Sequence, residues 1–133
     1  MISEHAALIY TMVLVSASDR EMTDSELKVI GTNVTSLPAF RGFDAAELPG
    51  ITEDCAHLLD QEDGLERALD LIRVALPVKL RETAYALACD VAVADGRVGQ
   101  EELRMLELVR HRLDVDRLTA AAIERGAKAR AAA

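Results

Sequence analysis

The chain has 133 residues, of which 50% are apolar and 29% are charged, and its formal net charge is −8. This length suits one domain, and the apolar fraction is far above that of a disordered chain. With 23 acidic against 15 basic residues, two Tyr, two Phe and no Trp, the chain lacks the cationic and aromatic surfaces on which nucleic-acid binding depends.

We expect neither a membrane span nor a signal peptide. The longest stretch without a charged residue runs from His5 to Ser18, well short of the roughly 20 apolar residues that a spanning helix needs. Glu4 stands where a signal peptide would be positively charged. Cys55 and Cys89 lie in apolar, helix-like surroundings, as buried thiols in a reducing compartment do. A cytoplasmic protein without direct membrane insertion is therefore expected.

Helix-forming residues dominate the chain and few stretches alternate with period two, which predicts an all-α fold. The first predicted helix, residues 3–18, is apolar on nearly every side, as a central buried helix is. A turn over residues 19–22 leads to a second helix, which starts at a capping box from Thr23 to Glu26 and ends before Pro38. Its apolar side carries Leu27, Ile30, Val34 and Leu37.

The middle of the chain is less regular. Residues 44–47 predict a short turn before Pro49 and Gly50, and a helix is expected over residues 52–61. Gly64 interrupts an acidic stretch and precedes the next helix. The apolar residues of that helix are Leu65, Leu69, Ile72 and Val74.

Pro77 opens a long predicted helix that ends near Ala94, because the missing N–H of proline costs nothing in a first turn. A turn over residues 95–98 follows, and then a helix over residues 100–112. We expect a last helix to begin at Asp114 as N-cap.

The end of the chain differs in charge from the rest. The last helix is predicted to reach about Arg125, and the tail from about residue 126 holds basic but no acidic residues. We expect this tail to fray. Residues 1–133 are expected to form a single domain.

An internal repeat relates the two ends of the chain. Shifting the sequence by 76 positions lays residues 15–37 onto residues 91–113. Five pairs are identical: Val15/Val91, Asp19/Asp95, Glu26/Glu102, Leu27/Leu103 and Leu37/Leu113. Each copy has a buried helix, a turn that opens with Asp, and a second helix with Glu at its third position. Two repeats are too few for a solenoid, so we predict a compact bundle around a pseudo-symmetric pair of helical hairpins.

The candidate site consists of the repeated acidic residues Asp19, Glu26, Asp95 and Glu102. In one interpretation each hairpin mouth collects carboxylates for a hard cation, with Asp24 added to the first mouth and Glu101 to the second. Ligands that offer only oxygen suit Mg²⁺, Ca²⁺ or Mn²⁺. The alternative is structural, because an Asp after a helix forms an Asx turn and a Glu at the third helical position completes a capping box. The residues alone leave both open.

The segment from Asp95 to Glu102 has the look of the second half of a calcium-binding EF-hand loop. Such a loop needs oxygen ligands four and two residues before that Asp. This chain has Val91 and Val93 there, and the other copy fails in the same way. A calcium EF-hand is therefore excluded.

The remaining candidates are weaker. Asp90 interrupts the apolar run of residues 86–93, so we expect it on the exposed edge of its helix, or else as a functional acid or partner contact. The histidines His5, His57 and His111 are scattered and lack the spacing of a zinc site. No motif of a nucleophilic hydrolase, a P-loop or a dinucleotide site occurs, so nothing favours catalysis.

Two segments carry a resemblance to a known family. Residues 91–98 read Val-Ala-Val-Ala-Asp-Gly-Arg-Val and are followed by Glu-Glu-Leu, while residues 17–27 hold a second copy around Asp19 and Thr-Asp-Ser-Glu-Leu. This resembles the TerB family of tellurite-resistance proteins, in which an Ala-x-Ala-Asp-Gly turn and a following Glu occur twice per domain. The resemblance covers residues 6–116. The first copy departs from the pattern at Arg20, where glycine is usual.

The resemblance implies an all-α bundle of about seven helices and a role in bacterial stress response and tellurite resistance. It implies a protein that is cytoplasmic or attached to the inner face of the inner membrane. Its implied partners are an integral membrane protein of the TerC type and calcium-binding proteins of the TerD type. No catalytic activity is implied. Metal chelation has been suggested for the paired acidic residues of the family, which here are Asp19, Glu26, Asp95 and Glu102.

We therefore expect a non-enzymatic TerB-like domain whose acidic face binds a divalent cation, a partner protein, or both. The alternative is a purely structural interaction module in which these acids cap helices and keep the domain soluble. The two hypotheses differ in whether the binding of Mg²⁺, Ca²⁺ or Mn²⁺ depends on the repeated acidic residues.

Overall fold

The computed structural model describes residues 1–19 and 22–132. In that part of the chain the regular elements are seven α-helices and two short 3-10 helices, and no strand occurs. In chain order they are α1 (Glu4–Ser16), α2 (Asp24–Ser36), η1 (Pro38–Phe40), η2 (Ala45–Glu47), α3 (Leu48–Leu59), α4 (Gly64–Ala75), α5 (Val78–Ala92), α6 (Gln100–Arg112) and α7 (Arg117–Ala131). The predicted all-α class is confirmed.

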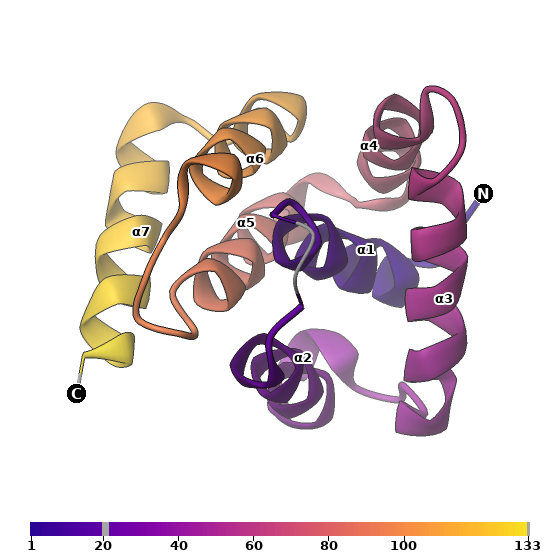
Figure 1. The fold of residues 1–133 in the computed structure, drawn as a ribbon, viewed down its shortest axis with the longest axis horizontal. Coiled ribbons are helices and arrows are strands. Elements are labelled where there is room, and N and C mark those ends of the chain that lie inside the picture. The colour runs from indigo at the N-terminus through magenta and orange to yellow at the C-terminus, as the bar shows by residue number, and fades with distance from the viewer. Residues whose placement is uncertain (20–21, 133) are drawn as a thin grey trace.

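Helices α1 and α5 form the centre of the bundle, and most other helices surround them with approximate twofold symmetry (Figure 1). The two central helices pack along each other, and α3 packs on α1 as α7 packs on α5. Helices α2 and α6 lie on opposite sides, and each contacts both central helices. Within the described residues α4 has no counterpart, and it packs on α1, α3 and α6. The predicted hairpins, α1–α2 and α5–α6, are the symmetric part of the fold.

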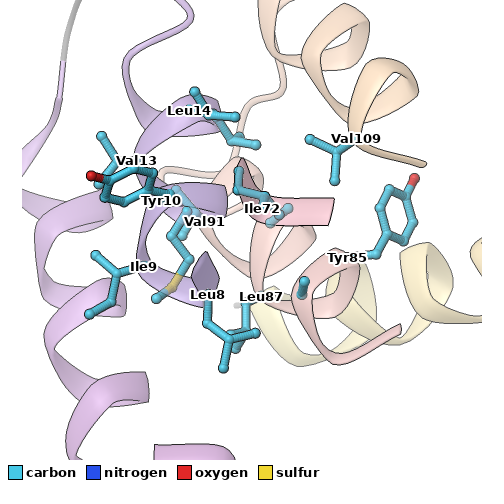
Figure 2. Close-up of a cluster of buried hydrophobic side chains, with 14 of the residues drawn as sticks. Leu8, Ile9, Tyr10, Val13, Leu14, Ile72, Tyr85, Leu87, Val91 and Val109 are labelled. Carbon is cyan, nitrogen blue, oxygen red and sulfur yellow. The ribbon is translucent and has the colours of Figure 1, made fainter. Parts of the chain in front are cut away.

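The central place of α1 follows from its composition. Every residue from Ala6 to Ser16 is buried, as predicted for a helix that is apolar all round. Side chains of α1, α4, α5 and α6 belong to one core cluster (Figure 2), which includes Leu8, Ile9, Val13, Leu14, Ile72, Leu87, Val91 and Val109. Although α1 is this apolar, no helix in the described part of the chain is long and apolar enough to cross a membrane.

The start of α3 differs from the prediction. The helix begins at Leu48 instead of Thr52, and Pro49 with Gly50, which were expected to precede the helix, lie inside its first turn. Proline is tolerated there because the first N–H groups of a helix have no partner within the helix. The predicted short turn before it is the 3-10 helix η2, which Asp44 caps by accepting a hydrogen bond from Ala46 N at 3.0 Å.

The start of α7 also differs. Its N-cap is Asp116, whose Oδ1 accepts from Leu118 N at 3.0 Å and from Thr119 N at 3.1 Å. Asp114, the predicted cap, instead has a left-handed φ of 55°, a conformation that Asp tolerates better than most side chains. The cap therefore lies two residues later than predicted.

The tail that was expected to fray from about residue 126 is helical to Ala131. Ala127 is only 1% exposed, and Arg130 Nη2 lies 2.8 Å from Asp90 Oδ1 on α5. These tertiary contacts extend the helix beyond Arg125, the predicted end.

Two residues that were predicted on apolar faces are exposed. Leu27 of α2 is 47% exposed and Val74 of α4 is 65% exposed. Leu103, the repeat counterpart of Leu27, is also exposed, at 53%. Each leucine directly follows a buried glutamate, and adjacent helical residues do not share a face. The two hairpins therefore expose the same apolar position.

Candidate functional site

Glu26, the glutamate of the first hairpin, lies in the first turn of α2 and contacts the end of α1. Thr23 is the N-cap, and its Oγ1 accepts a hydrogen bond from Glu26 N at 3.2 Å. Glu26 Oε1 accepts from Thr23 N at 2.9 Å and from Ser16 Oγ at 3.2 Å. The predicted capping box is confirmed, and its glutamate is only 1% exposed. The carboxyl group therefore faces the protein interior.

Glu102 takes the equivalent place in the second hairpin. Gly99 is the N-cap of α6, and its N–H donates to Glu102 Oε1 at 3.1 Å. Since Gly99 has no side chain, only this half of a capping box exists, and Ala92 stands where the first hairpin has Ser16. Glu102 is 3% exposed, and its Oε2 is buried without a hydrogen-bond donor among the described residues. One carboxyl oxygen is therefore left unsatisfied.

The carboxyl groups of Glu26 and Glu102 lie close enough for Glu26 to raise the pKa of Glu102, and to share a hydrogen bond when one of them is protonated. Two carboxylates offer only acceptors, so this contact is favourable only with a proton or a cation between them. The pKa of Glu102 is raised to about 7, and burial of the carboxyl group is the largest cause. The hydrogen bond from Gly99 N lowers this pKa, whereas the contact with Glu26 and the charges of Glu26 and Asp19 raise it further. Ionisation of Glu102 near neutral pH therefore costs free energy, because its carboxylate is buried beside a second carboxyl group.

The two aspartates of the predicted site have different surroundings. Asp19 contributes its negative charge to the environment of Glu102. Asp95 is exposed, and its Oδ1 accepts from Arg97 N at 3.1 Å, which is the Asx turn of the structural alternative. Gly96 follows with a φ of 82°, which glycine adopts without strain. Asp95 therefore has a structural role in its turn.

In the first hairpin the corresponding turn is described only in part. Arg20 and Glu21 lie outside the described residues, and with them the position where the chain departs from the glycine of the family pattern. Asp24 and Glu101, which were added to the two predicted sites, are exposed residues in the first turns of α2 and α6.

The chemistry of the glutamate pair suits a hard cation, because its ligands are carboxylate oxygens. No three His, Cys, Asp or Glu side chains within residues 1–19 and 22–132 lie close enough together to hold a metal ion by themselves. Mg²⁺ is often held by one or two carboxylates while it keeps several waters, whereas Ca²⁺ takes six to eight oxygen ligands. The pair therefore fits a partly hydrated ion better than a calcium cage.

Sequence reasoning places the glutamates at two separate hairpin mouths, whereas the fold brings their carboxyl groups together. Each of the helices α2 and α6 contacts both central helices, and the glutamates in their first turns are close enough for Glu26 to raise the pKa of Glu102. Ser16, which donates to Glu26, was not identified from the sequence. A signal was available, because Ser16 is a polar residue at the end of an otherwise apolar helix.

Three other candidates have structural roles. Asp90 is partly buried and pairs with Arg130, which joins α5 to α7. Burial raises the pKa of Cys55 and of Cys89 to about 12, so both thiols stay protonated and unreactive near neutral pH. The expectation of two buried cysteines is confirmed.

Comparison with known protein families gives a match over most of the chain. A family model described as tellurite resistance protein TerB matches residues 5–125. Both hairpins and the Glu26–Glu102 pair lie within the matched region. No curated protein and no solved structure matches the chain.

Proposed function

Since its residues 5–125 match the family model, this chain belongs to the TerB tellurite-resistance family, and we propose that it binds one divalent cation between Glu26 and Glu102. Asp19 adds negative charge beside the ion, while Asp95 shapes its turn. The domain is not an enzyme in this proposal, and it acts through binding alone.

The unsatisfied Glu102 Oε2, buried beside a second buried carboxyl group, is the observation that carries the proposal. A buried charge without a partner costs several kcal/mol in proteins. A divalent cation between the glutamates would neutralise both charges and give Oε2 a partner. The equivalent places of Glu26 and Glu102 in the repeat support a shared role.

Mg²⁺ and Mn²⁺ are the preferred ions in this proposal. Both suit oxygen ligands, and Mg²⁺ needs few protein ligands because it keeps its waters. Glu26 and Glu102 have four carboxylate oxygens between them, fewer than the six to eight oxygen ligands that Ca²⁺ takes. We therefore expect the order of affinity to place Ca²⁺ last.

Family membership supports a role in tellurite resistance and in stress response. We place the domain in the cytoplasm or at the inner face of the inner membrane, where it works with an integral membrane partner of the TerC type. A cation held between the first turns of α2 and α6 would link the two hairpins. Cation binding would then stabilise the surface that a partner meets.

A second candidate function is a structural interaction module without a cation. The Thr23 capping box and the Asp95 Asx turn favour it, because both are complete without a ligand. In this case a proton shared by Glu26 and Glu102 would remove one of the two charges and join the carboxyl groups by a hydrogen bond. Cation titration separates the two candidates.

Isothermal titration calorimetry of the full chain with Mg²⁺, Mn²⁺ and Ca²⁺ is the test. We expect one site per chain that Glu26→Gln and Glu102→Gln abolish. Glu101→Gln is the matched control, since it makes the same change at the adjacent, exposed position and should bind normally. Circular dichroism verifies that each variant is folded. Absence of binding at millimolar ion concentrations, or equal binding by all variants, would overturn the cation proposal.

A further inference from the structure

A groove of about 480 Å³ lies between α6 and α7, with residues of α5 at its base. Both helices pack on α5 but make little contact with each other. Val93, Leu103 and Leu106 contribute apolar surface to the groove, and Leu103 is 53% exposed. Ligand sites have volumes of roughly 300–1,000 Å³ and are mostly apolar. The groove is therefore large enough to receive several side chains.

In the first repeat, α1, α2 and α3 are arranged like α5, α6 and α7, and the link between α2 and α3 packs against them. This link contacts α2 through η1 and α3 through η2. Its Phe40 and Phe43 pack on each other, with ring centroids 5.8 Å apart, and on His5 of α1 at 5.6 and 5.3 Å. The link between α6 and α7, residues 113–116, is much shorter and has no aromatic residue. Within the described residues, the α2–α3 link therefore packs aromatic side chains against the first repeat, and the α6–α7 link has none to pack against the second.

The charges beside the groove indicate the chemistry of its occupant. Arg117 and Lys128 line it from opposite ends of α7, about 16 Å apart along the helix. Neither has an ion-pair partner among the described residues. Two carboxylates also line the groove, Glu107 and Glu124, and Glu124 keeps its charge although it accepts a 2.5 Å hydrogen bond from Tyr85 Oη. With Arg110 as a third lining cation, basic residues outnumber acidic ones by three to two. In a chain of net charge −8, two unpaired cations beside an apolar groove favour an acidic occupant.

We propose that this groove binds a short segment of a partner protein that carries aromatic side chains flanked by acidic residues. The segment covers α5, α6 and α7 as residues 37–47 cover α1, α2 and α3. The groove is separate from the Glu26–Glu102 pair, so the proposal does not depend on cation binding.

The probe is a fluorescein-labelled peptide with the sequence of residues 36–48, which contains both phenylalanines of the covering link together with Asp44 and Glu47. Fluorescence anisotropy with the full chain should show saturable binding that weakens with added salt. A peptide in which Phe40 and Phe43 are replaced by Ala should not bind. A peptide in which Asp44 and Glu47 are replaced by Lys should bind roughly tenfold more weakly at low salt.

Matched variants of the protein locate the binding. Leu103→Glu and Ala121→Glu alter residues that line the groove and should weaken binding by about tenfold or more. Leu27→Glu alters the equivalent exposed leucine of the other hairpin, and Ala122→Glu alters the adjacent exposed alanine outside the groove. Both controls should bind the peptide like the wild type.

Three results would overturn the proposal. The first is no saturable binding at millimolar peptide, or binding that both groove variants leave unchanged. The second is tighter binding of the lysine-substituted peptide, which would contradict an acidic occupant. The third is a dimer of the chain alone that Leu103→Glu dissociates in sedimentation, because the occupant would then be a second copy.

Discussion

Glu26 and Glu102 lie 76 positions apart in the sequence, yet their carboxyl groups meet between the first turns of α2 and α6 with 1% and 3% of each residue exposed. Each glutamate also closes the N-terminus of its helix by accepting a hydrogen bond from the N-cap N–H. Helix capping therefore brings two like charges together in the interior. That arrangement is destabilising unless a proton or a cation compensates it.

Replacing Glu102 by Gln should stabilise the metal-free protein at alkaline pH. The pKa of Glu102 is raised in the fold to about 7 from the ordinary 4.5, so the folded state binds the proton more tightly than the unfolded state does. The contribution of this group to the free energy of unfolding is then largest below pH 4.5, falls as the pH rises to 7, and is constant above. The full difference amounts to roughly 3 kcal/mol.

Urea unfolding in the presence of a chelator, from pH 4.5 to pH 8.5, measures this effect. The free energy of unfolding of Glu102→Gln minus that of the wild type should grow with pH up to about 7 and then level off. Glu101→Gln, at the adjacent exposed position, should show no such trend. A difference that stays constant with pH would show that the two glutamates are not coupled as described.

Asp19→Asn and Asp95→Asn should have different effects although the two residues are repeat counterparts. The charge of Asp19 raises the pKa of Glu102, so its removal should lower that pKa and weaken cation binding by about two- to fivefold, as expected for an exposed charge. Asp95 accepts from Arg97 N, and Asn can form the same Asx turn. NMR titration of the glutamate carboxyl carbons and calorimetry should show no change in Asp95→Asn. Equal effects of the two substitutions would contradict the assigned roles.

Gly64→Ala should destabilise the fold, whereas Gly31→Ala should stabilise it. A Cβ at Gly64 would lie 2.0 Å from the carbonyl oxygen of Leu58, so the backbone must move at a cost of about 1–3 kcal/mol or more. A Cβ at Gly31, inside α2, would meet no atom of the described residues within 4 Å. Alanine there should add about 0.5–1 kcal/mol through its higher helix propensity. Thermal unfolding followed by circular dichroism compares the two, and a stable Gly64→Ala would contradict the close contact.

Gly99→Ser should complete the capping box of α6. Gly99 has an extended φ of −77°, which any residue adopts, and an added Cβ would make only ordinary contacts, the nearest at 3.7 Å from Glu101 Oε2. The serine hydroxyl can accept from Glu102 N, as Thr23 Oγ1 accepts from Glu26 N in the first hairpin. We expect a gain of about 0.5–1 kcal/mol in urea unfolding. A loss of stability would mean that the two N-caps are not equivalent.

Local features of the chain could be predicted because they depend on neighbouring residues. The capping box at Thr23 and the Asx turn at Asp95 each form within four residues and follow from residue type and spacing. The burial of α1 on all sides follows from its apolar composition. The boundaries of α3 and α7 were wrong, because Pro49 is compatible with both a turn and a first helical turn and because Ala127 and Arg130 extend α7 through contacts with distant residues.

The sequence by itself determined the all-α class, the hairpin repeat and the acidic residues of the candidate site, since these are set by composition, periodicity and local hydrogen bonds. Only the tertiary structure brings the carboxyl groups of Glu26 and Glu102 together, while Asp95 accepts a hydrogen bond within its own turn. Only the tertiary structure decided that Leu103 borders an open groove. Both depend on how α2, α6 and α7 pack around α1 and α5, and packing between helices joins residues whose separation along the chain carries no local signal.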